Sequence, residues 1–204
     1  MKLRLGSRRS TLSLVQAELV LAALKRLEPD LEVEIVEIRT LGDKKQGTPE
    51  ASRSEKRDWI HELEVAVEEG AVDMAVHSGK DVPAVYSQIT EILPVLPRGR
   101  AFDVFIGRRI QAGGGRLKFK DIPEEGLVGC ASLRRRAQLL RIRPDLRFVE
   151  HRGNVTTRLE NLERFKSLSG IVLAQAGLDR LGLLGVDGDP LAPEQLVPAI
   201  NQGM

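Results

Sequence analysis

The residues best suited to chemistry in this sequence follow an apolar run and occupy the stretch Ala75-Val76-His77-Ser78-Gly79-Lys80-Asp81-Val82-Pro83. The alternation before them is typical of a strand, and Pro83 prevents simple continuation of that strand. Proteins that alternate strands and helices place functional groups at strand ends, where a carboxylate beside a lysine can hold a nitrogenous substrate and manage its charge. Spacing alone is equally consistent with a surface turn in which Lys80 and Asp81 are only hydrated.

A second concentration of chemistry is a set of eight arginines, with no lysine among them, in residues 132–158. The planar guanidinium binds carboxylates through two parallel hydrogen bonds and keeps its proton. Helix N-termini also favour anions, so the arginines near predicted helix starts, together with Ser132, predict two cradles for a ligand with several carboxylates: Arg134, Arg135, Arg152 and Arg158. A hydrated basic helix face better explains the other four, which are Arg136, Arg141, Arg143 and Arg147.

A third turn with an anion-binding composition, Gly6-Ser7-Arg8-Arg9-Ser10, lies between a predicted strand and a predicted helix. If both domains present their strand ends to one crevice, Arg8 and Ser10 face it. The polar segment 43–59, which includes Lys56, has no apolar periodicity. We interpret it as a long loop that acts as a lid, and a disordered segment without a role is the alternative.

Hydrophobic periodicity predicts the elements that must position these residues. Strands are expected at 3–6, 33–38, 104–106, 127–129, 146–149 and 170–173, with one more ending at His77. Helices are expected at 11–27, where Ser10 is the N-cap, and at 59–69, 133–142 and 155–165. This βαβαβ order favours an α/β fold with a parallel sheet covered by helices. A change in composition divides the chain into domain 1 (1–95, with 197–204 beginning a return to it) and domain 2 (98–193).

Composition excludes several classes of protein. A net charge of +2 and 3% aromatic residues argue against nucleic-acid binding. We expect no membrane span and no signal peptide, because no apolar run approaches about 20 residues. The three histidines lack ligand spacing, so no metal site is expected, and Cys130, the one cysteine, is expected to be a buried, inert thiol. The expected protein is a cytoplasmic monomer with a small-molecule partner.

Motifs in order along almost the whole chain resemble the porphobilinogen deaminase family, also called hydroxymethylbilane synthase. The motifs are Gly6-Ser7-Arg8-Arg9-Ser10, Glu62-Leu63-Glu64, residues 75–83, Ser132-Leu133-Arg134-Arg135, Arg152-Gly153-Asn154-Val155, Ala176-Gly177-Leu178-Asp179-Arg180-Leu181-Gly182 and Pro198-Ala199-Ile200-Asn201-Gln202-Gly203. The resemblance implies two periplasmic-binding-protein-like (type II) domains with mixed, mostly parallel sheets flanked by helices, and a small third α+β domain.

The resemblance also implies an activity. The family is a transferase of haem and tetrapyrrole biosynthesis that joins four porphobilinogen molecules head to tail and releases ammonia at each step. A dipyrromethane cofactor is tethered through a thioether to a cysteine of the third domain. Asp81 matches the catalytic carboxylate, and the cofactor side comprises Ser78, Lys80, Ser132, Arg134, Arg135 and Arg180. Arg8, Arg152 and Arg158, with Ser10 beside them, are assigned to the substrate, and Lys56 to the lid.

Three features depart from the family pattern. The sequence stops at Met204, before the third domain, and Cys130 stands where the family usually has a hydroxyl residue, so the tether is not transferred to it. The lid matches clearly only at Lys56, and Gly79 replaces a larger residue. We therefore expect a truncated form or a shortened, inactive relative. A non-catalytic two-lobed receptor for multi-carboxylate anions is the alternative function, which needs the arginines but not the Lys80–Asp81 pair.

Overall fold

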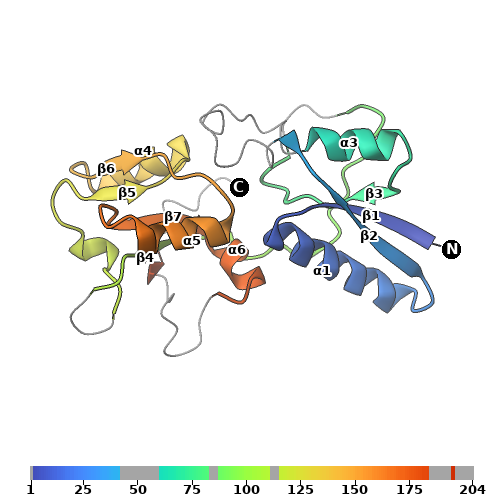
Figure 1. The fold of residues 1–204 in the computed structure, drawn as a ribbon, viewed down its shortest axis with the longest axis horizontal. Helices are drawn as coiled ribbons and strands as arrows, with labels where there is room; N and C mark the ends of the chain where they lie inside the picture. Colours follow the sequence, from blue (N-terminus) through green and yellow to red (C-terminus); the bar gives the residue numbers. More distant parts are fainter. Residues whose placement is uncertain (1, 42–59, 83–86, 111–114, 184–193, 196–204) are drawn as a thin grey trace. The chain divides into compact units, whose positions relative to one another are not determined.

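The computed structural model describes residues 2–41, 60–82, 87–110, 115–183 and 194–195 (Figure 1). The chain divides into two compact units, Met1–Arg98 and Gly99–Met204. Each unit contains one sheet, and each is described by itself.

The first unit is built around a parallel sheet of three strands in the order β2-β1-β3. Its elements are β1 (Lys2–Arg8), α1 (Thr11–Leu27), β2 (Glu32–Ile38), α3 (His61–Glu68) and β3 (Met74–Ala75). β1 is the central strand and is in register with β2 from Lys2↔Glu32 to Arg8↔Ile38. Figure 1 shows α1 and α3 flanking these strands. Because all three strands run in the same direction, their carboxyl ends meet at one edge of the sheet.

Helix α1 begins and ends where the sequence predicts, and its N-cap is also confirmed. Ser10 has an extended backbone (φ −69°, ψ 144°), and its hydroxyl oxygen accepts a hydrogen bond from the Ser13 N–H at 3.2 Å. The buried side of the helix packs Ala17 and Val20 against Leu5 of β1. The local signals, a cap and an apolar stripe, are therefore sufficient to define this helix.

The third strand is much shorter than predicted. The alternation of Val72, Met74 and Val76 predicts a strand that continues to His77, but β3 contains only Met74 and Ala75. Val72 precedes the strand, is buried, and lies so close to Gly6 that a Cβ there would be 3.1 Å from its Cγ2 atom. Beyond Ala75 the Val76 N–H still donates to the Gly6 carbonyl at 2.9 Å, and the chain then turns away from the sheet.

The second unit has a mixed sheet of five strands in the order β6-β5-β7-β4-β8. β5, β6 and β7 are parallel, whereas β4 is antiparallel to both of its neighbours. The elements are β4 (Asp103–Gly107), η3 (Phe119–Asp121), β5 (Leu127–Gly129), α4 (Leu133–Ile142), β6 (Arg147–Val149), α5 (Val155–Arg164), β7 (Gly170–Ala174), α6 (Gln175–Arg180) and β8 (Glu194–Gln195). The α/β class with helices beside mostly parallel strands is confirmed, although η3, α6 and β8 were not predicted.

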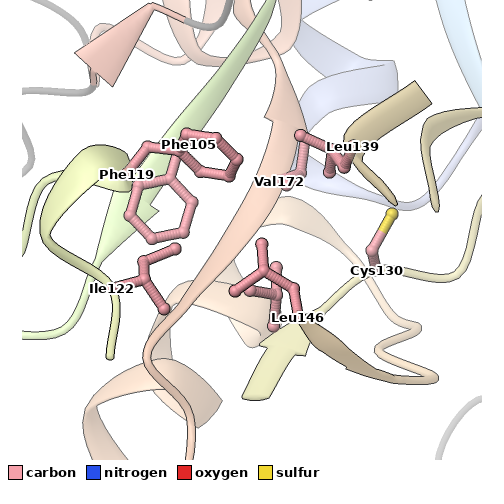
Figure 2. Packing of buried hydrophobic residues seen from close by; sticks show 8 residues of the cluster. Phe105, Phe119, Ile122, Cys130, Leu139, Leu146 and Val172 are labelled. Carbon is pink, nitrogen blue, oxygen red and sulfur yellow. The ribbon is translucent and has the colours of Figure 1, made fainter. Parts of the chain in front are cut away.

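Alternate residues of β4 supply two hydrophobic cores on the opposite faces of this sheet. Phe105 belongs to one cluster (Figure 2) and meets Phe119 edge to face, with ring centroids 5.5 Å apart. Val104 and Ile106 belong to the other cluster, with residues of α5 and α6. Both faces of the sheet are therefore covered. Functional side chains can be exposed at the edges of the sheet where the strands begin and end.

Candidate functional site

The carboxyl edge of the first sheet brings together two of the sequence motifs. Leu5 is paired with Met74 and Gly6 with Ala75, so the carboxyl ends of β1 and β3 lie at the same side of the sheet. Arg8 is the last residue of β1 and is followed by residues 9–10, and the stretch 77–82 follows β3. Arg8, which is half-buried, and the motif that contains Asp81 therefore belong to one edge of one unit.

A tight turn presents the predicted catalytic carboxylate. The Asp81 N–H donates to the Ser78 carbonyl at 2.9 Å, which closes a four-residue turn with Gly79 and Lys80 at its centre. Lys80 and Asp81 are exposed. A carboxylate and an ammonium group thus stand within one turn at a strand end, accessible to a solute.

Gln16 of α1 holds the start of this turn, a role that its sequence context did not predict. Its amide donates to the Ser78 hydroxyl at 2.8 Å, and that hydroxyl donates back to the Gln16 amide oxygen at 3.0 Å. Gln16 is only 8% exposed. The available signal was a polar amide between the apolar positions Val15 and Leu19 of the predicted helix. The arrangement fixes the Ser78 hydroxyl through both of its hydrogen-bonding functions.

The charges at this edge act on His77, which is half-buried. Burial lowers the pKa of His77 because it disfavours the charged ring, and the Arg8 guanidinium lowers the pKa further. The Glu64 and Asp81 carboxylates oppose this effect on the pKa. Arg8 and Asp81 therefore both influence the pKa of His77, in opposite directions, which agrees with their common position at this edge of the sheet.

Ser10 has an observed structural role. Its hydroxyl caps α1, lies 2.7 Å from the Ser13 hydroxyl, and belongs to a buried residue. The assignment of Ser10 to the substrate stays a prediction.

The corresponding edge of the second sheet carries the predicted arginine cradles. β5, β6 and β7 are parallel, so residues 130–132, 150–154 and 175 follow strand ends at the same edge. Strand β4 runs in the opposite direction and its first residue, Asp103, pairs with Ala174, the last residue of β7. The start of β4 therefore belongs to this edge as well.

The first cradle is formed at the start of α4. Ser132 is the N-cap, and its hydroxyl accepts from the Arg135 N–H at 3.4 Å. Arg134 is exposed. The Arg135 guanidinium instead forms an ion pair with Asp103, whose side chain is 0% exposed, against 13% for Arg135. Arg135 thus has a structural partner that the sequence did not reveal, and its contact with a cofactor stays a prediction.

The second cradle lies between β6 and α5. Arg152 is exposed, and its Nε atom is 2.7 Å from a Glu150 carboxylate oxygen. The Arg158 Nε–H donates to the Gly153 carbonyl at 2.9 Å. Gly153 has a φ of +116°, a backbone conformation that strongly favours glycine. The Arg158 side chain is therefore folded back onto the turn that carries Arg152.

Two further predicted site residues lie elsewhere along the chain. Arg180 ends α6 and is half-buried; a Cβ built at Gly99 would be 3.7 Å from its guanidinium group. Lys56, the predicted lid residue, lies outside the described residues.

The four arginines interpreted as a hydrated face differ from one another. Arg141 is exposed on α4, so the interpretation is confirmed for it. Arg147 forms an exposed ion pair with Glu125, but it is the first residue of strand β6 and does not lie on a helix face. The interpretation is wrong for the other two, because Arg136 donates to the carbonyl of residue 130 and Arg143 donates to that of residue 122. Both are partly buried, and they connect α4 and its C-cap to neighbouring loops.

Cys130 lies in the core, as predicted, and is 1% exposed (Figure 2). Burial raises the pKa of its thiol, which donates a weak hydrogen bond to the Ser132 carbonyl at 3.7 Å. Within the described ranges, His, Cys, Asp and Glu side chains form no group of three that could hold a metal ion. No helix in the described part of the chain is both long and apolar enough to span a membrane.

Comparison with known proteins identifies the family. A model described as "Porphobilinogen deaminase, dipyromethane cofactor binding domain" matches residues 3–204. The porphobilinogen deaminase of Geobacter sulfurreducens is 40% identical over 202 residues, which is 99% of this chain and 61% of the relative. The probable porphobilinogen deaminase of Hyperthermus butylicus is 42% identical over 204 residues, 100% of this chain and 65% of the relative.

The fold also has a counterpart among solved structures. The methionine-binding protein MetQ superposes with a TM-score of 0.51 at 14% identity, and the match covers 97% of this chain and 80% of that chain. This likeness supports the periplasmic-binding-protein-like fold and shows nothing about the ligand. The chain spans 61% of the length of the Geobacter relative. From the match that covers residues 3–204, we conclude that the chain belongs to the porphobilinogen deaminase family and contains its cofactor-binding domain.

Proposed function

We propose that this chain takes part in hydroxymethylbilane synthesis, the stepwise head-to-tail joining of four porphobilinogen molecules with release of ammonia at each step. The observation that carries the proposal is the exposed turn from Ser78 to Asp81, which shares a sheet edge with Arg8. The match to the family over residues 3–204 supports the same reaction.

Asp81 is assigned the catalytic role. As the amino group of the porphobilinogen aminomethyl side chain leaves as ammonia, positive charge develops on the methylene-pyrrole that remains. A carboxylate held next to that charge stabilises it and can accept a hydrogen bond from the pyrrole N–H. The α-carbon of a second pyrrole then forms the new carbon–carbon bond and loses its proton. The exposed Asp81, whose backbone is fixed by the bond to Ser78, is suited to this task.

Each sheet edge by itself supplies donors of the kind that a dipyrromethane requires, because its carboxylate side chains match hydroxyl, ammonium and guanidinium groups. We assign its binding to Ser78, Lys80, Ser132, Arg134, Arg135 and Arg180. When bound, the cofactor supplies the pyrrole to which the growing chain is joined. Cys130 does not fit the thioether attachment, because the thiol is buried and its pKa is raised.

The substrate side is assigned to Arg8, Ser10, Arg152 and Arg158, with Lys56 on the lid. Each porphobilinogen adds an acetate and a propionate, so the growing product accumulates negative charge. Guanidinium groups meet this requirement because they stay protonated at every working pH. The exposed Arg152 and the partly buried Arg158 differ in their freedom to move, which favours Arg152 as the group that follows the ligand.

We further propose that the protein is a cytoplasmic monomer that works without nucleic acid or membrane. The nearly balanced charge and the 3% aromatic content support the absence of nucleic acid, and the single cysteine supports the cytoplasmic location.

The test is turnover of porphobilinogen by the purified chain, measured as ammonia release, in the wild type and in Asp81→Asn. We expect Asp81→Asn to reduce turnover by about 100-fold or more while the circular dichroism spectrum stays unchanged. Asp30→Asn is the matched control, because Asp30 is an exposed aspartate of the same unit, beyond the other end of α1. Normal turnover by Asp81→Asn would refute the mechanism. Tight binding without turnover, unaffected by Asp81→Asn, would support the anion receptor instead.

A further inference from the structure

His151 is buried in the second unit, and the proposed function leaves it without a role. It lies between β6 and α5, directly before Arg152, and is 7% exposed. Its Nε2 atom is 3.1 Å from the Arg158 carbonyl oxygen. A carbonyl oxygen can only accept, so this contact is a hydrogen bond when Nε2 carries the proton. The geometry therefore selects one of the two neutral tautomers.

Backbone packing holds the imidazole in this place. A Cβ built at Gly129 of β5 would be 3.0 Å from both Cβ and Cγ of His151, and 3.0 Å from Ile171 of β7. The ring thus occupies space that any other residue at position 129 would fill. His151 packs against the sheet on one side and reaches the α5 backbone on the other.

The same arginine makes a second contact that closes the turn. The Arg158 side chain donates to the Gly153 carbonyl at 2.9 Å, while the Arg158 backbone is the partner of His151. Two hydrogen bonds therefore connect the beginning of the turn, its centre and the first part of α5. Arg152 lies between the connected points, so its backbone position depends on both bonds.

The surroundings of the ring favour its neutral form. Burial lowers the pKa of His151, and the positive charge of Arg158 lowers it further, although the bond to the Arg158 carbonyl acts in the opposite direction. The sheet presents Gly129 and Ile171 to this region, and the neighbouring Cys130 thiol is uncharged because burial raises its pKa. The positive charge that lowers the pKa of His151 is that of Arg158.

We propose that His151 is a positioning residue for the anion-binding arginines Arg152 and Arg158: its Nε2–H fixes the backbone of α5 and thereby the turn that presents them. The effect on ligands rests on the proposed function, whereas the hydrogen bond itself does not. His151 touches no ligand in this proposal and acts only through the two arginines.

The binding test compares His151→Leu and His151→Gln, because the glutamine amide can reproduce the Nε2–H donor and leucine cannot. Calorimetric titration with porphobilinogen should give an affinity about fivefold lower for His151→Leu, corresponding to one lost hydrogen bond, and one within about twofold of the wild type for His151→Gln. His61→Leu is the control, because His61 is an exposed histidine of the first unit. Equal affinities of the wild type and His151→Leu would overturn the proposal.

A second measurement reads the contact without a ligand. Nitrogen-15 NMR should find the Nε2–H tautomer in the wild type, and hydrogen exchange of the Arg158 Nε–H should be about fivefold faster in His151→Leu. Detection of the Nδ1–H tautomer, or unchanged exchange, would overturn the positioning role. If His151→Leu does not fold, the tautomer found in the wild type and the affinity of His151→Gln for porphobilinogen still test the positioning role. Failure of the wild type to bind porphobilinogen would refute the proposed function. The exchange measurement would then still test whether His151 fixes the turn, because it needs no ligand.

Discussion

Replacement of Arg135 by leucine should destabilise the second unit by about 3–5 kcal/mol, because it leaves the Asp103 carboxylate buried without its cation. The magnitude follows from the burial of the pair. The Asp103 side chain is 0% exposed and that of Arg135 is 13% exposed, so water cannot replace the missing partner. An exposed pair, such as that of Arg147 with Glu125, would contribute at most about 1 kcal/mol.

A double-mutant cycle separates the pair from the side chains that form it. Asp103→Leu alone should also be strongly destabilising, because it leaves the Arg135 guanidinium largely buried and unpaired. The double variant Asp103→Leu/Arg135→Leu removes both charges and should be within about 2 kcal/mol of the wild type. The decrease in the free energy of unfolding should therefore be much larger in each single variant than in the double variant.

The assay is urea denaturation followed by far-ultraviolet circular dichroism. Arg141→Leu is the matched control, an exposed arginine of the same helix, and should change the free energy of unfolding by less than about 0.5 kcal/mol. An Arg135→Leu variant as stable as this control would refute the reasoning and leave Arg135 available for the cofactor contact predicted from the sequence.

Two other predictions can be tested on the same protein. Gln16→Leu removes both partners of the Ser78 hydroxyl and should reduce porphobilinogen turnover about fivefold with little change in the midpoint of thermal unfolding; turnover equal to the wild type would exclude a role for this contact. The pKa values of His77 and His151 lie below the ordinary 6.5, so the unfolded chain binds more protons, and the free energy of unfolding should fall as the pH decreases below about 6.5. Urea titrations from pH 7.5 to 5 measure this slope, and His151→Gln should make it shallower; an unchanged slope would contradict the assignment.

The sequence predicts well those elements whose signals are local. The cap at Ser10, the apolar stripe of α1 and the glycine after α3, whose φ is +68°, are each contained within a few residues. The length of β3 was not predictable in this way, because its pairing with β1 ends at Gly6 and Ala75 although β1 itself continues to Arg8. The reversed direction of β4 likewise depends on a distant segment, because β4 pairs with β7. β4 starts at Asp103 and β7 starts at Gly170, 67 residues later.

The same distinction applies to the candidate sites. The strand-end motifs around Asp81 and Arg134 were found because each is a continuous stretch of sequence. Gln16 and Asp103 were missed because their partners are 62 and 32 residues away, and neither carries a motif of its own. Residues that support a site therefore become visible only when the fold brings distant segments together.

The reversed orientation of β4 has a practical consequence for engineering. In both sheets the motifs discussed above follow the carboxyl ends of parallel strands, and the chain enters β4 at that same edge of the second sheet. The connections at the far edges, residues 28–31, 143–146 and 165–169, carry none of the proposed ligand-binding residues. Connections 143–146 and 165–169 contain the core residues Leu146 and Leu168, whereas 28–31 is largely exposed. Labels, affinity tags or inserted loops placed at 28–31 would therefore report on the protein while leaving its chemistry intact.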